Sequence, residues 1–476
     1  MSILVVDVGT SSVRVLVVHD DGTTSHERHV ETLPTSPHPG LVEFDPAAMA
    51  TAARDLCDGV TDEVGDVAAL AIANQRASTV LWDARTGEAL GPGLGWQDVR
   101  TVGRCLELRA QGLRVAPNQS ATKAEWLIGQ TDVAAEHLRL GTVDAWIAWR
   151  LSAGAHHVTD ATNAAVTGLY DVATADWDDD VLDRLGIPRT ALPEVVDTLG
   201  VAGQADDVHH APPIAAICGD QQASLVGQGC IDGGDAKVTF GTGGMLDICL
   251  DAPPPVQPPS GTFPIVTRQQ DGRPSFGIEA VMLAAGTSVE WLRDGLGIIE
   301  SAEESAALAG TVDSTDGVVF VPSLSGTGTP EWDHGARGLL IGVSRGTTRA
   351  HVVRAVLEGI AQRGADLVEA AEEAAGLRID ALRIDGGMSR NPIFVQALAD
   401  AAQRPVEVSA EREATALGAG FLAGVAVGTW SGLGDAVASR RSPTTVEPDG
   451  TLDRERFADA RARAARWIPE ISDLDL

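Results

Sequence analysis

Lysine is almost absent from the 476-residue chain, in which Lys123 and Lys237 are the two lysines and arginine supplies the other cations. Acidic residues outnumber basic ones, 67 to 35, so the formal net charge is −32. A surface this acidic repels nucleic acid and anionic membranes. We therefore expect neither a nucleic-acid partner nor a membrane partner.

The five cysteines are scattered and include no CxxC pair, which argues against a disulfide framework or a structural zinc site. No apolar run reaches the roughly 20 residues that cross a bilayer. The N-terminus reads directly as a strand and lacks the charged start and cleavage site of a signal peptide. These absences predict a cytoplasmic protein.

The sequence contains one local pattern twice. Residues 3–6 predict an apolar strand, residues 7–12 a polar turn with glycine, and residues 13–19 a second strand; residues 236–240, 241–244 and 245–250 repeat this order. A chain of this length suits two or three domains. We predict an α/β protein of two related domains, residues 1–230 and 231–476. Residues 415–427 predict a helix rich in small residues.

The first turn, residues 7–12, has groups that suit a phosphate and a cation. Gly9 lets backbone N–H groups approach a phosphate, and Thr10, Ser11, Ser12 and Arg14 add donors and charge. Asp7, at the strand end, could ligate magnesium. An ordinary hairpin turn with side-chain hydrogen bonds explains the same residues equally well.

Two further glycine turns suggest nucleotide binding. Gly241 and Thr242 begin the second turn, and Gly386 and Gly387 follow a strand that ends at Asp385. Each turn alone is also a common structural turn. Neither GxxxxGK[ST] nor a GxGxxG after a strand is present, so P-loop and Rossmann folds lose support.

Asp220 follows the predicted strand 214–217 near the domain junction. Phosphoryl transfer to an alcohol needs a carboxylate that accepts the hydroxyl proton, and we predict that role for Asp220; a helix-capping aspartate is the structural alternative. Arg76 could donate to substrate hydroxyls, and Trp96 could form an apolar wall. Simple core packing of Trp96 is the competing interpretation.

Together these segments resemble the FGGY carbohydrate kinases, and within them the glycerol-kinase-like branch. The resemblance runs through nearly the whole chain in the expected order. Segments that carry it are residues 40–46, 74–76, 96–98, 141–146, 158–160, 219–222, 338–358 and 418–419.

The resemblance implies two ribonuclease H-like, actin-like domains with a central nucleotide cleft, the first binding the substrate and the second the nucleotide. It implies ATP and Mg²⁺ as cofactors, Asp220 as the base, and Asp7 with Asp220 as metal ligands. Residues that would contact the nucleotide are Thr10, Ser11, Ser12, Arg14, Gly241, Thr242, Gly286, Glu290, Gly386, Gly387 and Gly418. Residues that would contact the polyol are Arg76, Ala77, Trp96, Asn118, Asp220, Gln221 and Met245.

Three positions of the expected polyol pocket depart from the glycerol kinase pattern. Ala77 replaces a glutamate, Asn118 a tyrosine and Met245 a phenylalanine. Loss of a carboxylate that accepts bonds from substrate hydroxyls should weaken glycerol binding. Ala77 and Asn118 are smaller than the expected residues, so the pocket could suit a four- or five-carbon polyol or ketose.

We predict ATP-dependent phosphorylation of a primary hydroxyl of glycerol or a related small polyol or sugar. A xylulose- or erythritol-type kinase is the alternative within the enzyme class. An actin-like, ATP-dependent assembly or regulatory protein is the alternative of another class, because fold alone does not imply function. We expect a small-molecule substrate and a homodimer or higher homo-oligomer.

Overall fold

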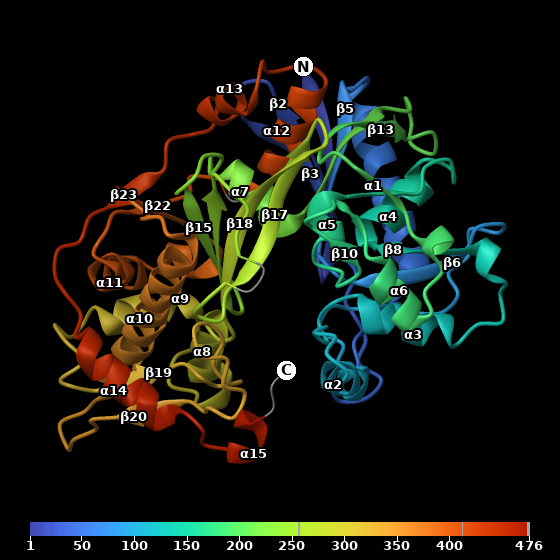
Figure 1. Ribbon diagram of the computed structural model, residues 1–476. Coiled ribbons are helices and arrows are strands. Elements are labelled where there is room, and N and C mark those ends of the chain that lie inside the picture. The colour runs from blue at the N-terminus through green and yellow to red at the C-terminus, as the bar shows by residue number, and fades with distance from the viewer. Residues whose placement is uncertain (256–257, 412, 474–476) are drawn as a thin grey trace.

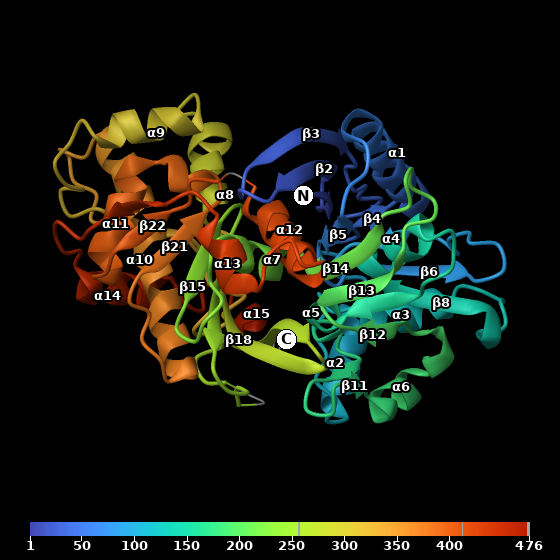
Figure 2. The same ribbon diagram turned by 90° about the horizontal axis from the view of Figure 1, so that it is seen from above.

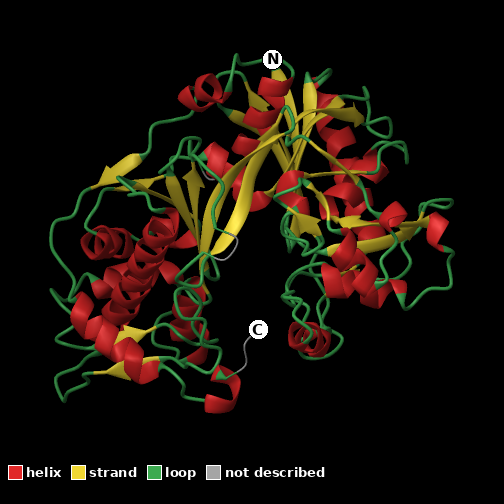
Figure 3. Ribbon diagram, in the orientation of Figure 1, coloured by secondary structure: helices red, strands yellow, loops and turns green. Residues whose placement is uncertain are grey.

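The computed structural model describes residues 1–255, 258–411 and 413–473. Two large mixed sheets, each with helices against it, form two lobes (Figure 1, Figure 3). The first sheet has the spatial order β13 (Leu199–Gln204), β14 (Pro213–Gly219), β5 (Ala69–Asn74), β1 (Ser2–Val8), β2 (Ser12–His19) and β3 (Thr24–Glu31). The second has the order β17 (Phe263–Gln270), β18 (Arg273–Met282), β16 (Gly244–Leu250), β15 (Ala236–Phe240), β21 (Leu382–Asp385), β22 (Val406–Val408) and β23 (Thr444–Val446).

The two sheets share one topology. Each begins with an antiparallel hairpin, β1–β2 or β15–β16, extended by a further antiparallel strand, β3 or β18; the second sheet adds β17 beyond β18. On the other side of β1 and of β15 lie two parallel strands and then an antiparallel one. The repeated pattern that the sequence predicted therefore corresponds to two sheets of the same design.

The remaining strands form smaller sheets. They are β4 (Glu43–Phe44), β7 (Gly93–Leu94), β6 (Thr79–Asp83) and β8 (Leu138–Thr142) in one sheet, and the pairs β10 (Tyr170–Asp171) with β11 (Asp176–Trp177), β12 (Glu194–Val196) with β9 (Val158–Asp160), and β19 (Val319–Val321) with β20 (Leu339–Ile341).

Helices cover both large sheets. Those before residue 230 are α1 (Pro46–Val64), α2 (Val102–Ala110), α3 (Ala121–Ile128), α4 (Val143–Leu151), α5 (Ala161–Ala164), α6 (Asp179–Leu185) and α7 (Asp220–Gly227). Those after it are α8 (Gly286–Glu290), α9 (Ala302–Ala309), α10 (Arg349–Ala375), α11 (Pro392–Ala402), α12 (Ala414–Ala426), α13 (Leu433–Ala438), α14 (Arg454–Ala464) and α15 (Pro469–Ser472). Among the described residues, none of these helices combines the length and the hydropathy that a membrane-spanning helix requires.

Strand β1 is apolar on both faces because both faces are covered. Leu4 and Val6 lie in a core with α1 and α4, whereas Ile3 and Val5 lie in a core with α12. All four side chains are fully buried. A continuous apolar run is what a strand between two helical layers requires.

Helix α12 joins the late part of the sequence to the first sheet. Its Leu417 and Phe421 belong to the same core as Ile3 and Val5, and α12 crosses α7 between the lobes (Figure 2). Gly418 permits that crossing, since a Cβ there would overlap the carbonyl of Ala223 on α7. We keep residues 1–230 and 231–476 as the proposed domains, with α12 packed across their junction.

Candidate active site between the two sheets

The first glycine turn joins β1 to β2. The Gly9 N–H donates to the Ser12 carbonyl at 2.9 Å, which closes the turn. Thr10 and Ser12 are half-buried and Ser11 is exposed. Their hydroxyls therefore lie on a tight turn at the end of two central strands of the first sheet, as phosphate contacts would require.

A group of half-buried charged side chains lies beside this turn. Asp7 and Arg14 are cross-strand partners on β1 and β2, and Arg14 forms an ion pair with Glu413 at the N-terminus of α12. Removal from water, and then the nearby Asp220 carboxylate, raise the pKa of Asp7 to about 7, against a smaller lowering by Arg14. Two carboxylates that oppose each other's ionisation form a setting that favours a cation.

The second glycine turn packs directly against the start of α8. The N–H groups of Ala285 and Gly286 donate to the carbonyls of Thr242 and Gly241, each at 2.9 Å. A Cβ on Gly286 would lie 2.6 Å from the Gly241 oxygen, so only glycine allows this approach. A Cβ on Gly241 would meet no atom of another residue nearby, out to 4 Å. Glu290 lies at the end of α8, with its side chain exposed.

The third turn adjoins the second. Gly386 has φ 84°, a conformation that favours glycine, and a Cβ there would overlap the backbone of Phe240. Gly387 then begins the short helix that ends at Arg390. The structure thus brings Gly241, Gly286 and Gly386 together from three separate parts of the sequence.

Gly418 lies elsewhere, in the crossing of α7 and α12, where its Cα faces Ala223 and Gly227. The structure shows a packing role for this glycine. Contact with a nucleotide stays a prediction for Gly418.

Asp220 begins α7, directly after β14. Its Oδ1 accepts the Gln221 N–H at 2.7 Å and lies 4.0 Å from Nε of Arg76, and its side chain is 31% exposed. Burial raises the pKa of Asp220, while the Arg76 charge and the Gln221 N–H oppose that rise. The result is a reachable carboxylate whose pKa stays raised despite the Arg76 charge, and a raised pKa favours uptake of a proton, as a general base requires.

Asp220 is also connected to the glycine turns. Ser224, one turn further along α7, donates to Oδ2 of Asp385 at 2.9 Å, and Asp385 immediately precedes Gly386. Helix α7 therefore links the predicted base in the first lobe to the predicted nucleotide turns in the second.

Arg76 reaches across the lobes. Its Nη2 donates to Oε2 of Glu279 on β18 at 2.5 Å, and both side chains are 13% exposed. Its Nη1 is buried without a hydrogen-bond partner among the described residues. A donor held in this way is available to a ligand oxygen.

Trp96 connects the first turn to the predicted polyol side. Its indole Nε1 donates to Oγ1 of Thr10 at 3.1 Å. Lys123 Nζ donates to the carbonyls of Trp96 and Asn118, at 3.2 and 3.3 Å, and burial lowers the pKa of this lysine to about 7. Asn118 is exposed and Trp96 is half-buried, so Trp96 is not part of a closed core, and its role as a pocket wall stays a prediction.

Ala77 occupies a tight turn behind Arg76. Its φ is 61°, unusual for alanine, and its carbonyl accepts hydroxyl bonds from Thr79 and Ser120 at 3.1 and 3.0 Å. Its methyl group offers no hydrogen bond. Met245, half-buried on β16, is cross-strand from Thr239.

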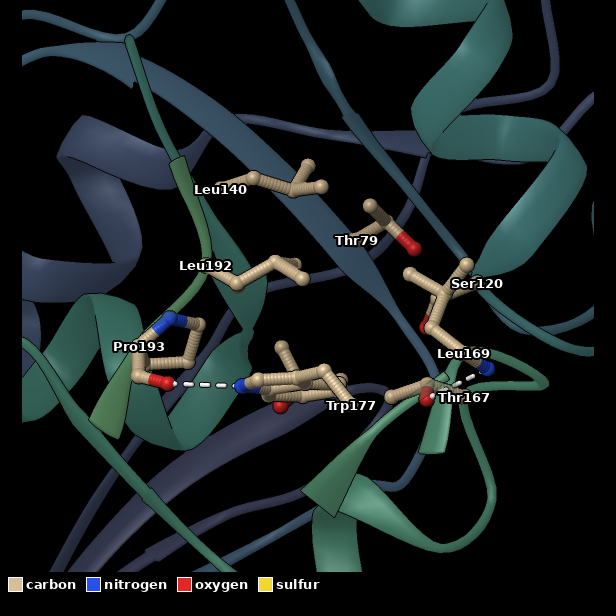
Figure 4. Close-up of a pocket in the computed structure, with 10 residues that line it drawn as sticks. Thr79, Ser120, Leu140, Thr167, Leu169, Trp177, Leu192 and Pro193 are labelled. Carbon is tan, nitrogen blue, oxygen red and sulfur yellow. Dashed lines mark hydrogen bonds between the residues drawn. The ribbon is translucent and has the colours of Figure 1, made fainter. Parts of the chain in front are cut away.

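A small apolar cavity lies beyond the Ala77 turn, lined by Thr79, Ser120 and Trp177 among others (Figure 4). It leaves about 10 Å³ for the centre of a water molecule. Trp177 closes one side and donates to the Pro193 carbonyl at 2.9 Å. Such a volume holds at most one water, so this cavity is not the substrate site.

Sequence reasoning missed three charged residues of the site: Glu279, Lys237 and Asp247. Lys237 and Asp247 form a buried ion pair of 3.0 Å between β15 and β16. A signal was available, because Asp247 interrupts the apolar run of β16 and Lys237 is one of two lysines. Glu279 interrupts the apolar residues of β18 in the same way, between Ile278 and Ala280.

Comparison with known proteins places these observations in a family. Residues 2–227 match the N-terminal domain, and residues 236–427 the C-terminal domain, of the FGGY family of carbohydrate kinases. A glycerol kinase from Aromatoleum aromaticum is 40% identical over 484 residues, covering 97% of each chain.

Solved structures of similar fold are also carbohydrate or glycerol kinases. A glycerol kinase from Plasmodium falciparum with ADP has a TM-score of 0.90 at 28% identity, covering 100% of this chain and 99% of that one. A xylulose kinase from Rhodospirillum rubrum, at 24% identity and a TM-score of 0.86, covers 99% of this chain and 100% of its own and shares the fold.

These matches confirm the resemblance seen in the sequence, the two-domain actin-like α/β fold and the enzyme class. The roles of individual site residues stay predictions. The chain belongs to the FGGY family of carbohydrate kinases and is an ATP-dependent alcohol kinase.

Proposed function

We propose that this protein transfers the γ-phosphoryl group of ATP to a primary hydroxyl of glycerol or a related small polyol. One observation carries the proposal: the Asp220 carboxylate, at the end of β14, is held between Arg76 and the Gln221 N–H, on a helix bonded to the third glycine turn. The glycerol kinase names of relatives near 40% identity support the choice of acceptor.

The transfer follows from the roles of these groups. Asp220 accepts the proton of the acceptor hydroxyl as its oxygen forms a bond to the γ-phosphorus. The bond from that phosphorus to the bridging oxygen breaks, and ADP leaves with the electron pair. The backbone of the turns at Gly241, Gly286 and Gly386 would hold the nucleotide phosphates.

Magnesium fits the carboxylates present. Mg²⁺ commonly binds through one or two carboxylates together with substrate phosphates. Asp7, with its pKa raised to about 7 by burial and by the Asp220 charge, is a carboxylate that a cation would relieve. When bound, Mg²⁺ neutralises charge on the phosphate oxygens; Asp7 and Asp220 would hold it.

The cytoplasmic location and the homo-oligomeric state of the protein stay predictions.

A larger acceptor is the second candidate. Ala77 presents a methyl group where a carboxylate could accept substrate hydroxyls, and Asn118 is exposed. A site without that carboxylate discriminates less strongly for glycerol. A four- or five-carbon polyol or ketose, as in erythritol- or xylulose-type kinases, fits this difference.

An ADP-release assay with glycerol, erythritol, xylitol and xylulose tests both candidates. The highest kcat/KM for glycerol supports the first candidate, and the highest for a longer acceptor supports the second. The same assay is run on Asp220→Asn, which removes the predicted base. Asp206→Asn, at an exposed position, is its matched control. No ADP release above background with any acceptor would overturn the proposed function.

A further inference from the structure

Lys237, on β15, holds its ammonium group inside the protein against three oxygen atoms. Its side chain is 0% exposed. Nζ contacts Oε1 of Gln221 at 2.5 Å, Oγ1 of Thr239 at 3.0 Å and Oδ2 of Asp247 at 3.0 Å. Two of these contacts are hydrogen bonds, to Gln221 and Thr239, and the third is an ion pair with Asp247.

This contact determines the orientation of the Gln221 amide. An ammonium group donates and never accepts, so the amide atom that faces Lys237 must be the oxygen, Oε1. Nε2 is then the free arm of the planar amide and has no hydrogen-bond partner among the described residues. Gln221 is half-buried, and its backbone N–H already binds Asp220.

Asp247 balances the lysine charge. It is 1% exposed, and β16 places it directly across from Lys237 on one side and Glu279 on the other. Among the described residues, neither of its carboxylate oxygens accepts a hydrogen bond, and its contact with Lys237 is an ion pair. A cation without this partner would be costly to bury, so Asp247 stabilises Lys237 in the position from which it binds Gln221.

We propose that Lys237, balanced by Asp247, is a positioning residue that turns the Gln221 amide so that Nε2 donates to an oxygen of the acceptor. This role rests on the proposed function, because it needs a polyol or sugar acceptor beside Asp220. Arg76 offers a second donor there, since its Nη1 is buried and unpaired. The acceptor is thus recognised through oxygens that accept two N–H bonds while its reacting hydroxyl donates to Asp220.

Steady-state kinetics of Lys237→Met and of Lys237→Met with Asp247→Leu test the role. The double variant replaces the buried pair by apolar side chains, which avoids leaving one charge unpaired. We expect the KM of the best acceptor to rise about tenfold, the loss of one hydrogen bond. We expect kcat to change much less and the Kd of ADP to stay unchanged.

A double-mutant cycle with Gln221→Ala separates positioning from general destabilisation. Once Lys237 is removed, removal of the Gln221 side chain should raise KM little further, so the two effects should be strongly non-additive. Arg404→Met breaks a half-buried ion pair with Glu372 and should leave the acceptor KM unchanged. An additive cycle, or a folded double variant with the wild-type KM, would overturn the positioning role.

Gln221→Glu gives a second test, which does not depend on removing Lys237. The carboxylate still accepts from the Lys237 ammonium group but has no N–H donor for the acceptor. Its KM should therefore rise as in Gln221→Ala, and a KM equal to that of the wild type would overturn the assignment. If wild-type enzyme phosphorylates no acceptor, the proposed function fails and this role with it. If the wild type is active and the variants keep its acceptor KM, the positioning role alone is wrong.

Discussion

The ion pair between Arg76 and Glu279 joins the two lobes at the acceptor site, and Glu279→Gln removes its negative charge. In the native protein, Nη2 of Arg76 is 2.5 Å from Oε2 of Glu279, whereas Nε is 4.0 Å from Oδ1 of Asp220. Without Glu279 the guanidinium keeps Asp220 as its near carboxylate. We expect Arg76 to move toward Asp220 and to compete there with the substrate hydroxyl.

The stability loss expected for Glu279→Gln follows from the distance between the charges and their burial. Two charges 4 Å apart attract by about 4 kcal/mol at an effective dielectric constant near 20. Desolvation and the 13% exposure of each side chain reduce the net value. Breaking a buried pair costs about 3–5 kcal/mol. Because Asp220 remains as a partner for Arg76, we expect a stability loss of about 2 kcal/mol.

The assay measures kcat, KM for the acceptor and thermal unfolding of Glu279→Gln. We expect kcat to fall about tenfold and the acceptor KM to rise, because Arg76 leaves its position and occupies the base. Glu372→Gln removes a carboxylate from the pair with Arg404 and controls for stability alone. If Glu279→Gln keeps kcat and KM within twofold of wild type, Glu279 does not hold Arg76 for catalysis.

Two other predictions concern the nucleotide turns and the buried carboxylates. Gly286→Ala places a Cβ 2.6 Å from the Gly241 oxygen, so the KM for ATP should rise by about 10- to 100-fold. Gly103→Ala, where a Cβ meets no atom within 4 Å, should leave the KM for ATP unchanged. Equal KM values for the two variants would refute the packing argument. Burial and the Asp160 charge raise the pKa of Asp144 from 3.8 to about 7, so the folded state holds this proton more tightly and stability falls as pH rises from about 4 to about 7. Asp144→Asn should flatten that fall by at most about 4 kcal/mol, measured by urea unfolding at pH 5 and pH 8, and an unchanged pH dependence would contradict the assignment.

Local sequence patterns predicted the parts of the fold that depend on neighbouring residues. The strand, glycine turn and strand around Gly9 and around Gly241 are local, and both form as expected. Asp220 directly follows a strand, as its position after an apolar run predicted. These features need only the alternation of apolar residues with turn residues.

Features that depend on strand register or on distant packing could not be predicted. Lys237 and Asp247 are ten residues apart, and only the register of β15 and β16 places them side by side. Glu279 meets Arg76 because the two lobes meet. The helix predicted at residues 415–427 forms, but its packing against the first sheet follows from its close approach to α7.

The central claim is that Asp220 accepts the proton of the acceptor hydroxyl. Its most direct test is the kcat of Asp220→Asn with the best acceptor, together with the Kd of ADP. The account predicts that kcat falls by at least about 100-fold, the usual contribution of a general base, while ADP binds as in the wild type. A variant that turns over its acceptor at the wild-type rate would contradict the account.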